Sequence, residues 1–252
     1  MVNMKFIIPN RKDDKPELDM INQLRFSQDY VKWKNPNAEF EIINEFEVPS
    51  FQIKNYCPVG SVEFCQEMFK CSNLPYVKPI NIPNCLMKFR KCQNNSFEGY
   101  ENGERAYIKS TEIIKSELND CYRIDEATRY IFRDGNFQIS KYIENIESEY
   151  RVFVYENKIV GMKHYLGNPF NVPDEYVVKN FIDIISKSDE NRIAYTLDVA
   201  VIQDDTMDYE TIPIEMHDFF ACGLYGFDDN EKYPWMLWRW WNEYKRKYEN
   251  KI

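Results

Sequence analysis

Alternating apolar and polar positions in the second half of the chain predict a series of β-strands. Segments 150–155 and 158–165 alternate in this way on either side of Glu156-Asn157, which is typical of a hairpin closed by a tight turn. Asp134-Gly135 gives another turn signal, just before a further alternating run. The strands predicted in this half cover residues 105–110, 136–143, 150–155, 158–165, 194–202 and 211–217.

Helical spacing of apolar residues predicts several helices. Within residues 172–187, Val178, Phe181 and Ile185 fall on one face of a helix. Ser61 is a natural N-cap for a second helix, because its hydroxyl can accept a hydrogen bond from a free backbone N–H of the first turn. The predicted helices cover residues 17–34, 61–70, 172–187 and 234–248, and two early strands are predicted at 4–8 and 40–46.

A proline-rich segment separates the two halves. Pro75, Pro79 and Pro83 exclude a long helix or a central strand there, so we expect a connecting segment. Together these elements predict a mixed α+β fold with antiparallel pairing in the second half.

Composition narrows the classes of function. Lys and Arg total 32 and Asp and Glu total 41, so the net charge is −9 and no nucleic-acid partner is expected. No signal peptide opens the chain and no stretch approaches the roughly 20 apolar residues that span a bilayer, so we expect a cytoplasmic protein with no membrane partner. Seven cysteines without a Cys-x-x-Cys pair, and only two histidines, favour free thiols over a zinc site or disulfides.

Two carboxylates interrupt otherwise apolar predicted strands. Asp198 is surrounded by Leu197, Val199 and Ala200, and Glu215 follows Ile214. A carboxylate in such a place is costly unless it is paired or binds a cation. If the two strands are neighbours, both carboxylates can share Mg²⁺ ions; otherwise they are solvated or paired with nearby Arg and Lys.

Three cations stand on the same group of predicted strands. Lys109 ends one strand, and Arg151 and Lys163 lie on the two arms of the hairpin. A lysine ammonium binds a phosphate as a point charge, whereas the planar guanidinium of arginine binds it through two parallel hydrogen bonds. The alternative for each is an exposed strand cation with no ligand.

Three motifs, in order between residues 148 and 227, resemble those of the ATP-grasp superfamily. They are Ser148-Glu-Tyr-Arg-Val-Phe-Val, Thr196-Leu-Asp-Val-Ala-Val and Ile214-Glu-Met-His-Asp-Phe-Phe-Ala-Cys-Gly-Leu-Tyr-Gly-Phe. The chain looks most similar to the R-two-K clade of small, often phage or bacterial, ATP-grasp proteins. Pro58-Val-Gly-Ser-Val-Glu-Phe is similar to the N-terminal region of that clade.

The resemblance implies an α+β ATP-grasp fold, in which two α+β subdomains grip a nucleotide and a small α/β pre-ATP-grasp region precedes them. Residues 1–95 would form that N-terminal region and residues 96–252 the ATP-grasp domain. Within the domain, residues 96–142 would form a lysine-bearing subdomain and residues 143–252 a metal-binding subdomain.

The resemblance also implies roles for particular residues. A hinge at residues 140–144 would contact adenine, largely through backbone groups, and Arg151 and Lys163 would be catalytic cations. The implied nucleotide contacts are Lys109, Lys141, Tyr142, Ile143, Glu144, Arg151 and Lys163, and the implied metal ligands are Asp198, Glu215 and His217.

Two departures from the family pattern affect these roles. The family usually has Asn two residues after the metal-binding Glu, and this chain has His217. His217 would shift the metal preference, act as a general base or point elsewhere, and the adjacent Asp218 is an alternative ligand. The region after Lys109 also lacks a Gly-rich phosphate lid, so side chains must bind the phosphates instead.

The function implied by the resemblance is an ATP-dependent ligase that joins a carboxylate to an amine or a thiol through an acyl phosphate. Its cofactors would be ATP and Mg²⁺, with Mn²⁺ as an alternative metal, and its partners would be small-molecule, peptide or protein substrates that supply the carboxylate and the amine. A phosphotransferase is an alternative. A nucleotide-binding regulatory module with little turnover is another, favoured by His217 and the missing lid. The sequence leaves the substrates and the oligomeric state open.

Overall fold

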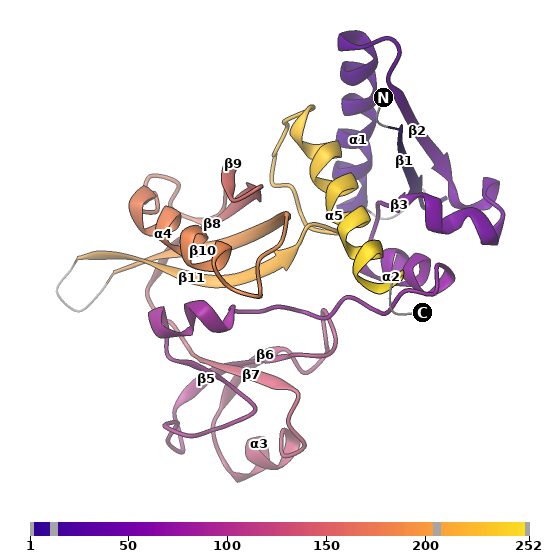
Figure 1. Ribbon diagram of the computed structural model, residues 1–252. Coiled ribbons are helices and arrows are strands. Elements are labelled where there is room, and N and C mark those ends of the chain that lie inside the picture. Colours follow the sequence, from indigo (N-terminus) through magenta and orange to yellow (C-terminus); the bar gives the residue numbers. More distant parts are fainter. Residues whose placement is uncertain (1–2, 11–14, 204–207, 250–252) are drawn as a thin grey trace.

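The structure, a computed structural model, describes residues 3–10, 15–203 and 208–249. These residues form three sheets in three parts of the molecule (Figure 1). The N-terminal sheet is parallel, in the order β2-β1-β3, and consists of β1 (Asn3–Ile8), β2 (Glu39–Asn44) and β3 (Cys57–Pro58). The helices α1 (Lys15–Lys34), α2 (Val62–Cys71) and α5 (Lys232–Glu249) pack against it.

Two antiparallel sheets form the rest of the molecule. The middle sheet has the order β4-β7-β5-β6 and consists of β4 (Cys92–Asn94), β5 (Arg105–Ser110), β6 (Asp120–Arg123) and β7 (Phe137–Lys141), with helix α3 (Glu126–Ile131). The C-terminal sheet has the order β11-β10-β8-β9 and consists of β8 (Ile146–Tyr155), β9 (Lys158–Gly167), β10 (Ala194–Gln203) and β11 (Tyr209–Asp218), with helix α4 (Glu175–Ser186). Short 3₁₀ helices occur at Glu45–Glu47, Ser50–Asn55 and Asn84–Phe89.

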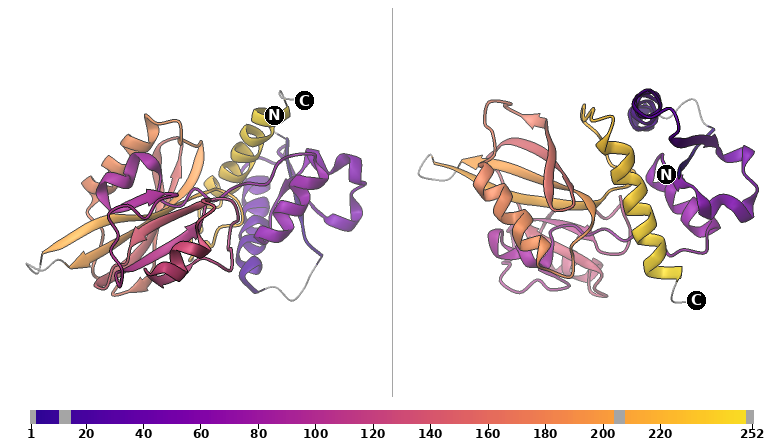
Figure 2. Two further views of the ribbon diagram at one scale, coloured as in Figure 1. Left: turned by 90° about the horizontal axis from the view of Figure 1, so that it is seen from below. Right: turned by 45° about the horizontal axis from the view of Figure 1, so that its top comes forward.

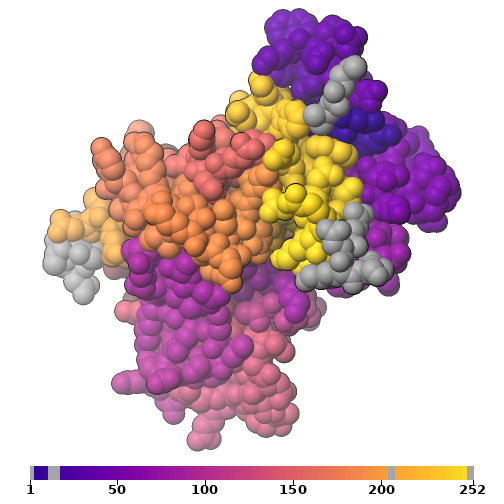
Figure 3. All heavy atoms as spheres, in the orientation of Figure 1, coloured from indigo at the N-terminus to yellow at the C-terminus, as the bar shows by residue number. Residues whose placement is uncertain are grey.

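The C-terminal helix α5 shares its core with the N-terminal sheet. Trp241 is fully buried and Trp240 is 3% exposed, and both belong to the apolar cluster that includes Phe6 of β1 and Phe69 of α2. Figure 2 shows α5 running between the N-terminal part and the C-terminal sheet, and its surface adjoins both in Figure 3. The tryptophans therefore join parts of the fold that lie far apart in the sequence.

Among the described residues, no helix is long and apolar enough to cross a membrane.

The hairpin predicted from the alternating pattern is present. Strands β8 and β9 pair as predicted, and the turn residues Glu156 and Asn157 have φ angles of 49° and 60°. Positive φ at both positions gives the turn a twist that matches the right-handed twist of the strands. The strand predicted at 136–143 is shorter, because β7 ends at Lys141 and the chain leaves the middle sheet there. The proposed domain boundaries stay a prediction.

Candidate nucleotide and metal site

Three of the predicted metal ligands come together on strands β10 and β11. Asp198 and Glu215 are directly opposed residues of the antiparallel pair, and His217 opposes Thr196 two positions further along. One ligand atom from each of Asp198, Glu215 and His217 lies within 4.8 Å of the others. Carboxylate oxygens suit Mg²⁺, and an imidazole nitrogen adds a donor that Mn²⁺ accepts. This donor set therefore fits a divalent cation, and the ligand roles stay a prediction.

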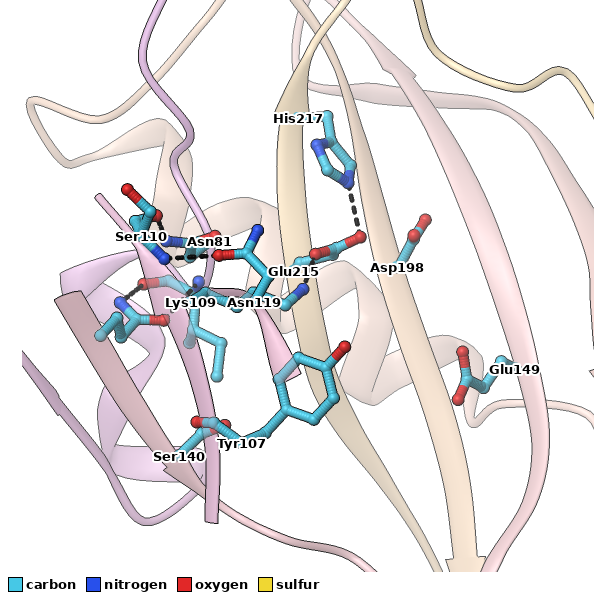
Figure 4. Close-up of polar contacts among 12 residues, drawn as sticks. Asn81, Tyr107, Lys109, Ser110, Asn119, Ser140, Glu149, Asp198, Glu215 and His217 are labelled. Atoms are coloured by element: carbon cyan, nitrogen blue, oxygen red, sulfur yellow. Dashed lines mark hydrogen bonds and ion pairs between the residues drawn. The ribbon is translucent and has the colours of Figure 1, made fainter. Parts of the chain in front are cut away.

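Lys109 reaches this group from the middle sheet. Its Nζ forms an ion pair with Glu215 Oε2, and His217 Nε2 lies 2.6 Å from Glu215 Oε1. Figure 4 shows Lys109 and His217 on either side of the Glu215 carboxylate. Burial by itself raises the pKa of Glu215, but the adjacent His217 and Lys109 outweigh burial and hold the pKa well below its usual value. Glu215 is therefore an anion between two sheets, where a bound cation can take the place of the lysine.

Arg151 is buried and engaged with the aspartate of the same group. Its Nε and Nη2 donate to the two carboxylate oxygens of Asp198 at 2.8 and 2.7 Å, and its Nη1 donates to the carbonyl of Gly223 at 3.0 Å. Burial opposes the charge on Arg151, but Asp198 outweighs it and raises the pKa of the guanidinium. Arg151 thus orients Asp198 and fixes the loop after β11. A contact between Arg151 and a nucleotide stays a prediction.

A cavity of about 680 Å³ opens between this group and the N-terminal part of the molecule. It is lined from the N-terminal side by residues of helix α2 and from the other side by Lys109, Glu215 and His217. Lys115, in the loop after β5, also lines it and supplies a further cation. The cavity is therefore wide enough for phosphates together with a second molecule.

A second cavity, of about 630 Å³, lies at the hinge between the two antiparallel sheets. Of the five predicted hinge residues, four line it, namely Lys141, Tyr142, Ile143 and Glu144, and Ser140 does not. The guanidinium of Arg105 lies 3.7 Å from the centre of the Tyr142 ring, a cation–π contact that holds this ring in place. The structure brings these four hinge residues to one cavity, and their contact with adenine stays a prediction.

Lys163 lies apart from the group around Glu215. It stands on the outer strand β9, opposite Arg151, and its Nζ is 3.4 Å from Asp228 Oδ1. Neither of the two cavities has Lys163 in its lining. The structure therefore does not bring Lys163 together with Lys109, and its catalytic role stays a prediction that rests on the resemblance.

The alternative ligand Asp218 serves a structural purpose. Its Oδ1 accepts a hydrogen bond from Trp240 Nε1 at 2.8 Å and forms an ion pair with Arg192 Nε at 3.2 Å. These contacts tie the end of β11 to helix α5 and to the loop before β10. Among the described residues, Asp218 is not part of the ligand group, so His217 is the better candidate.

Two charged residues near the predicted site residues were not predicted from the sequence. Arg90 lines the hinge cavity, donates from Nη2 to the carbonyl of Lys141 at 3.1 Å, and has a buried Nε without a hydrogen-bond partner among the described residues. Glu149 lies on β8, two positions before Arg151, and accepts a hydrogen bond from the Tyr165 hydroxyl. Glu149 belongs to the motif Ser148-Glu-Tyr-Arg-Val-Phe-Val, so its place in that motif could have marked it as a candidate site residue. Arg90 lies outside any alternating pattern and carries no such signal.

Comparisons with known proteins agree with this architecture. The model of a family described as ATP-grasp domain, R-two-K clade family 2, matches residues 90–234, and no curated protein sequence matches the chain. The crystal structure of D-cycloserine synthetase DcsG is similar with a TM-score of 0.57 at 12% identity, over 95% of this chain and 99% of that one. A D-alanine–D-alanine ligase from Bacillus anthracis gives 0.52 at 10% identity, over 98% and 100% of the two chains. These similarities confirm the predicted α+β ATP-grasp fold.

Proposed function

The chain belongs to the ATP-grasp domain family of the R-two-K clade, family 2, and on that premise we propose that it is an ATP-dependent ligase that joins a carboxylate to an amine or a thiol. One observation carries the proposal: Lys109 of the middle sheet meets Glu215 of the C-terminal sheet, beside Asp198 and His217. A lysine on one side and grouped metal ligands on the other suit a triphosphate that carries a divalent cation.

In this proposal the nucleotide spans the two cavities. The adenine lies at the hinge, against residues 141–144, and the phosphates lie between Lys109 and Glu215. Asp198, Glu215 and His217 would hold Mg²⁺ or Mn²⁺, which would supply positive charge against the negative charge on the phosphate oxygens. Arg151 keeps Asp198 in its liganding orientation, and Lys163 adds positive charge at the outer edge of the sheet.

The proposed chemistry has two steps. A carboxylate oxygen of the first substrate attacks the γ-phosphorus of ATP, the bond from that phosphorus to the bridging oxygen breaks, and ADP leaves. The amine nitrogen of the second substrate then attacks the acyl carbon, the inorganic phosphate leaves with the bonding electrons, and the nitrogen loses a proton. Lys109 stabilises the charge of the phosphate in the first step from the sheet opposite the metal ligands.

The cavity of about 680 Å³ beside helix α2 is the proposed place for the two substrates. Two proteins of similar fold are named as a D-alanine–D-alanine ligase and a D-cycloserine synthetase, which supports a small molecule as substrate. A ligase that consumes ATP and carries seven free cysteines belongs in the reducing, ATP-rich cytoplasm.

A regulatory module with little turnover is the second candidate. Two contacts favour it: Arg151 engages both oxygens of Asp198, and His217 engages Glu215. A nucleotide would then bind at the hinge, but the carboxylates would not be free to bind the metal ion that phosphate transfer needs.

Product analysis distinguishes the candidates. The ligase predicts ADP release that depends on both a carboxylate and an amine, in the presence of Mg²⁺ or Mn²⁺. ADP release with a lasting phosphorylated product would identify a phosphotransferase instead. Thermal stabilisation by Mg-ATP without ADP release would favour the module. No thermal shift with Mg-ATP would contradict every candidate that binds a nucleotide.

A further inference from the structure

Asn81, in the connecting segment, contacts both of the sheets that close on the cleft. Its side-chain Nδ2 donates to the carbonyl of Ser110 at 2.9 Å, directly after Lys109. Its own carbonyl accepts the N–H of Met216 at 2.7 Å, directly after Glu215. Asn81 is 4% exposed, and Figure 4 shows it beside the pair formed by Lys109 and Glu215.

The local backbone holds Asn81 in this position. Its φ angle is +57°, in the left-handed region that asparagine tolerates better than most residues with a side chain. The next residue, Ile82, exchanges two hydrogen bonds of 2.9 Å with the buried side chain of Gln138 on β7. Gln138 is the strand partner of Lys109 in the middle sheet. The connecting segment is therefore fixed to the middle sheet at two points that flank the lysine.

The hinge and Asn81 join the two sheets at opposite ends of the cleft. The hinge cavity is lined by Arg105 of β5 and Ile212 of β11, whereas Asn81 contacts these two strands further along, at Ser110 and Met216. The hinge is a covalent connection, and Asn81 is a hydrogen-bonded one.

We propose that Asn81 is a positioning residue that sets the separation between the phosphate lysine and the metal-binding glutamate. The inference rests on the proposed binding of Mg-ATP between Lys109 and Glu215. Adenine binding needs only the hinge, whereas a triphosphate with its cation must touch both sheets at a fixed spacing. Loss of the Asn81 bridge therefore weakens triphosphate binding selectively.

Asn81→Gly tests this inference, because glycine keeps the left-handed backbone and removes only the side-chain donor to Ser110. Calorimetry with Mg²⁺ and a non-hydrolysable ATP analogue should show about tenfold weaker binding, with adenosine binding unchanged. Asn95→Gly is the matched control. Asn95 also has a positive φ, of 54°, and its side chain accepts the N–H of Phe137 on the middle sheet, away from β11. The control should bind both ligands as the wild-type chain does.

The outcomes separate this inference from the proposed function. Equal loss of adenosine and analogue binding, or no loss of either, in Asn81→Gly would overturn the positioning role and leave nucleotide binding intact. Failure of the wild-type chain to bind the analogue would overturn both. If the glycine variant does not fold, Asn81→Asp keeps the size of the side chain and removes the amide donor. The same selective loss is then expected, and wild-type binding by that variant would overturn the inference.

Discussion

Two cation–carboxylate pairs meet in the cleft, and they differ in what holds them together. Arg151 and Asp198 oppose one another on adjacent strands of one sheet, with side chains 8% and 2% exposed. Lys109 and Glu215 come from different sheets, and their side chains are 24% and 19% exposed. Strand register creates the first pair, whereas the second exists only where the two sheets close on each other.

On the proposed function, the Arg151–Asp198 pair mainly stabilises the fold and orients the ligand Asp198, whereas the Lys109–Glu215 pair gives way to the phosphate and the cation. The guanidinium of Arg151 donates a hydrogen bond to each oxygen of the buried Asp198 carboxylate, so removing either residue leaves the other as an unpaired buried charge. The Lys109–Glu215 pair is open to solvent on one side, and a phosphate and a cation can replace its two members. Four predictions test this division, from the largest expected effect to the smallest.

The largest effect is expected where the two sheets meet. Lys109→Ala removes the cation proposed to bind the transferred phosphate, and Glu215→Gln removes the charge of a proposed metal ligand. In each variant ADP release should fall by about 10²–10³-fold. Their melting temperatures should stay near that of the wild-type chain, since the pair is partly exposed. Steady-state kinetics and thermal unfolding measure both quantities. Near-wild-type ADP release would show that the phosphates bind elsewhere.

Breaking the other pair should act on stability first. Arg151→Met leaves Asp198 buried without its partner, and the free energy of unfolding should fall by about 3–5 kcal/mol. Urea unfolding measures this loss. The double variant Arg151→Met with Asp198→Leu removes both charges and should recover most of it. Equal stability of Arg151→Met and Lys109→Ala would contradict the division into a structural pair and a binding pair.

A smaller effect is expected on the choice of metal. His217→Asn replaces an imidazole with an amide oxygen, so Mn²⁺ binding should weaken by about tenfold relative to Mg²⁺ binding. Electron paramagnetic resonance of free Mn²⁺, with Mg²⁺ as competitor, reports this ratio without a need for turnover. An unchanged ratio would place His217 outside the metal site.

The smallest effect is expected at Cys222, which is buried beside the Arg151–Asp198 pair. Burial raises the pKa of Cys222 to about 11, although the nearby Arg151 acts in the opposite direction. At pH 8 the thiol is therefore protonated and should react slowly with alkylating reagents, while the exposed Cys71 reacts quickly. Mass spectrometry after timed labelling compares the two sites. Cys222→Ser should release ADP at the wild-type rate, and a large loss would indicate a nucleophile.

Much of the fold was predictable because its strands alternate strongly. The hairpin of β8 and β9 follows from a period of two residues and a short turn. The sequence left open whether the strands of Asp198 and Glu215 are neighbours, and the structure pairs them directly. The short elements β4, β6 and α3 were not predicted, since three to six residues carry too little periodicity to be recognised. The true end of β7 was also missed, because apolar residues continue past Lys141 into the hinge.

The residues of the candidate site also fall into those that the sequence pointed to and those that only the structure revealed. Asp198 and Glu215 could be found from the sequence, because each is a carboxylate within an apolar strand, whereas His217 was implied only by the resemblance to the ATP-grasp family. Arg90 and Asn81 could not, since each lies in an irregular segment and meets its partners through distant backbone groups.

By itself, the sequence determined the long strands, the carboxylates within them and the class of fold, because these depend on local periodicity and on motifs. Only the tertiary structure decided which cation meets which carboxylate. Arg151 takes Asp198 within one sheet, while Lys109 crosses to Glu215, 106 residues away in the chain. That choice depends on how two sheets and a connecting segment pack, and no pattern along the chain encodes a contact of this range.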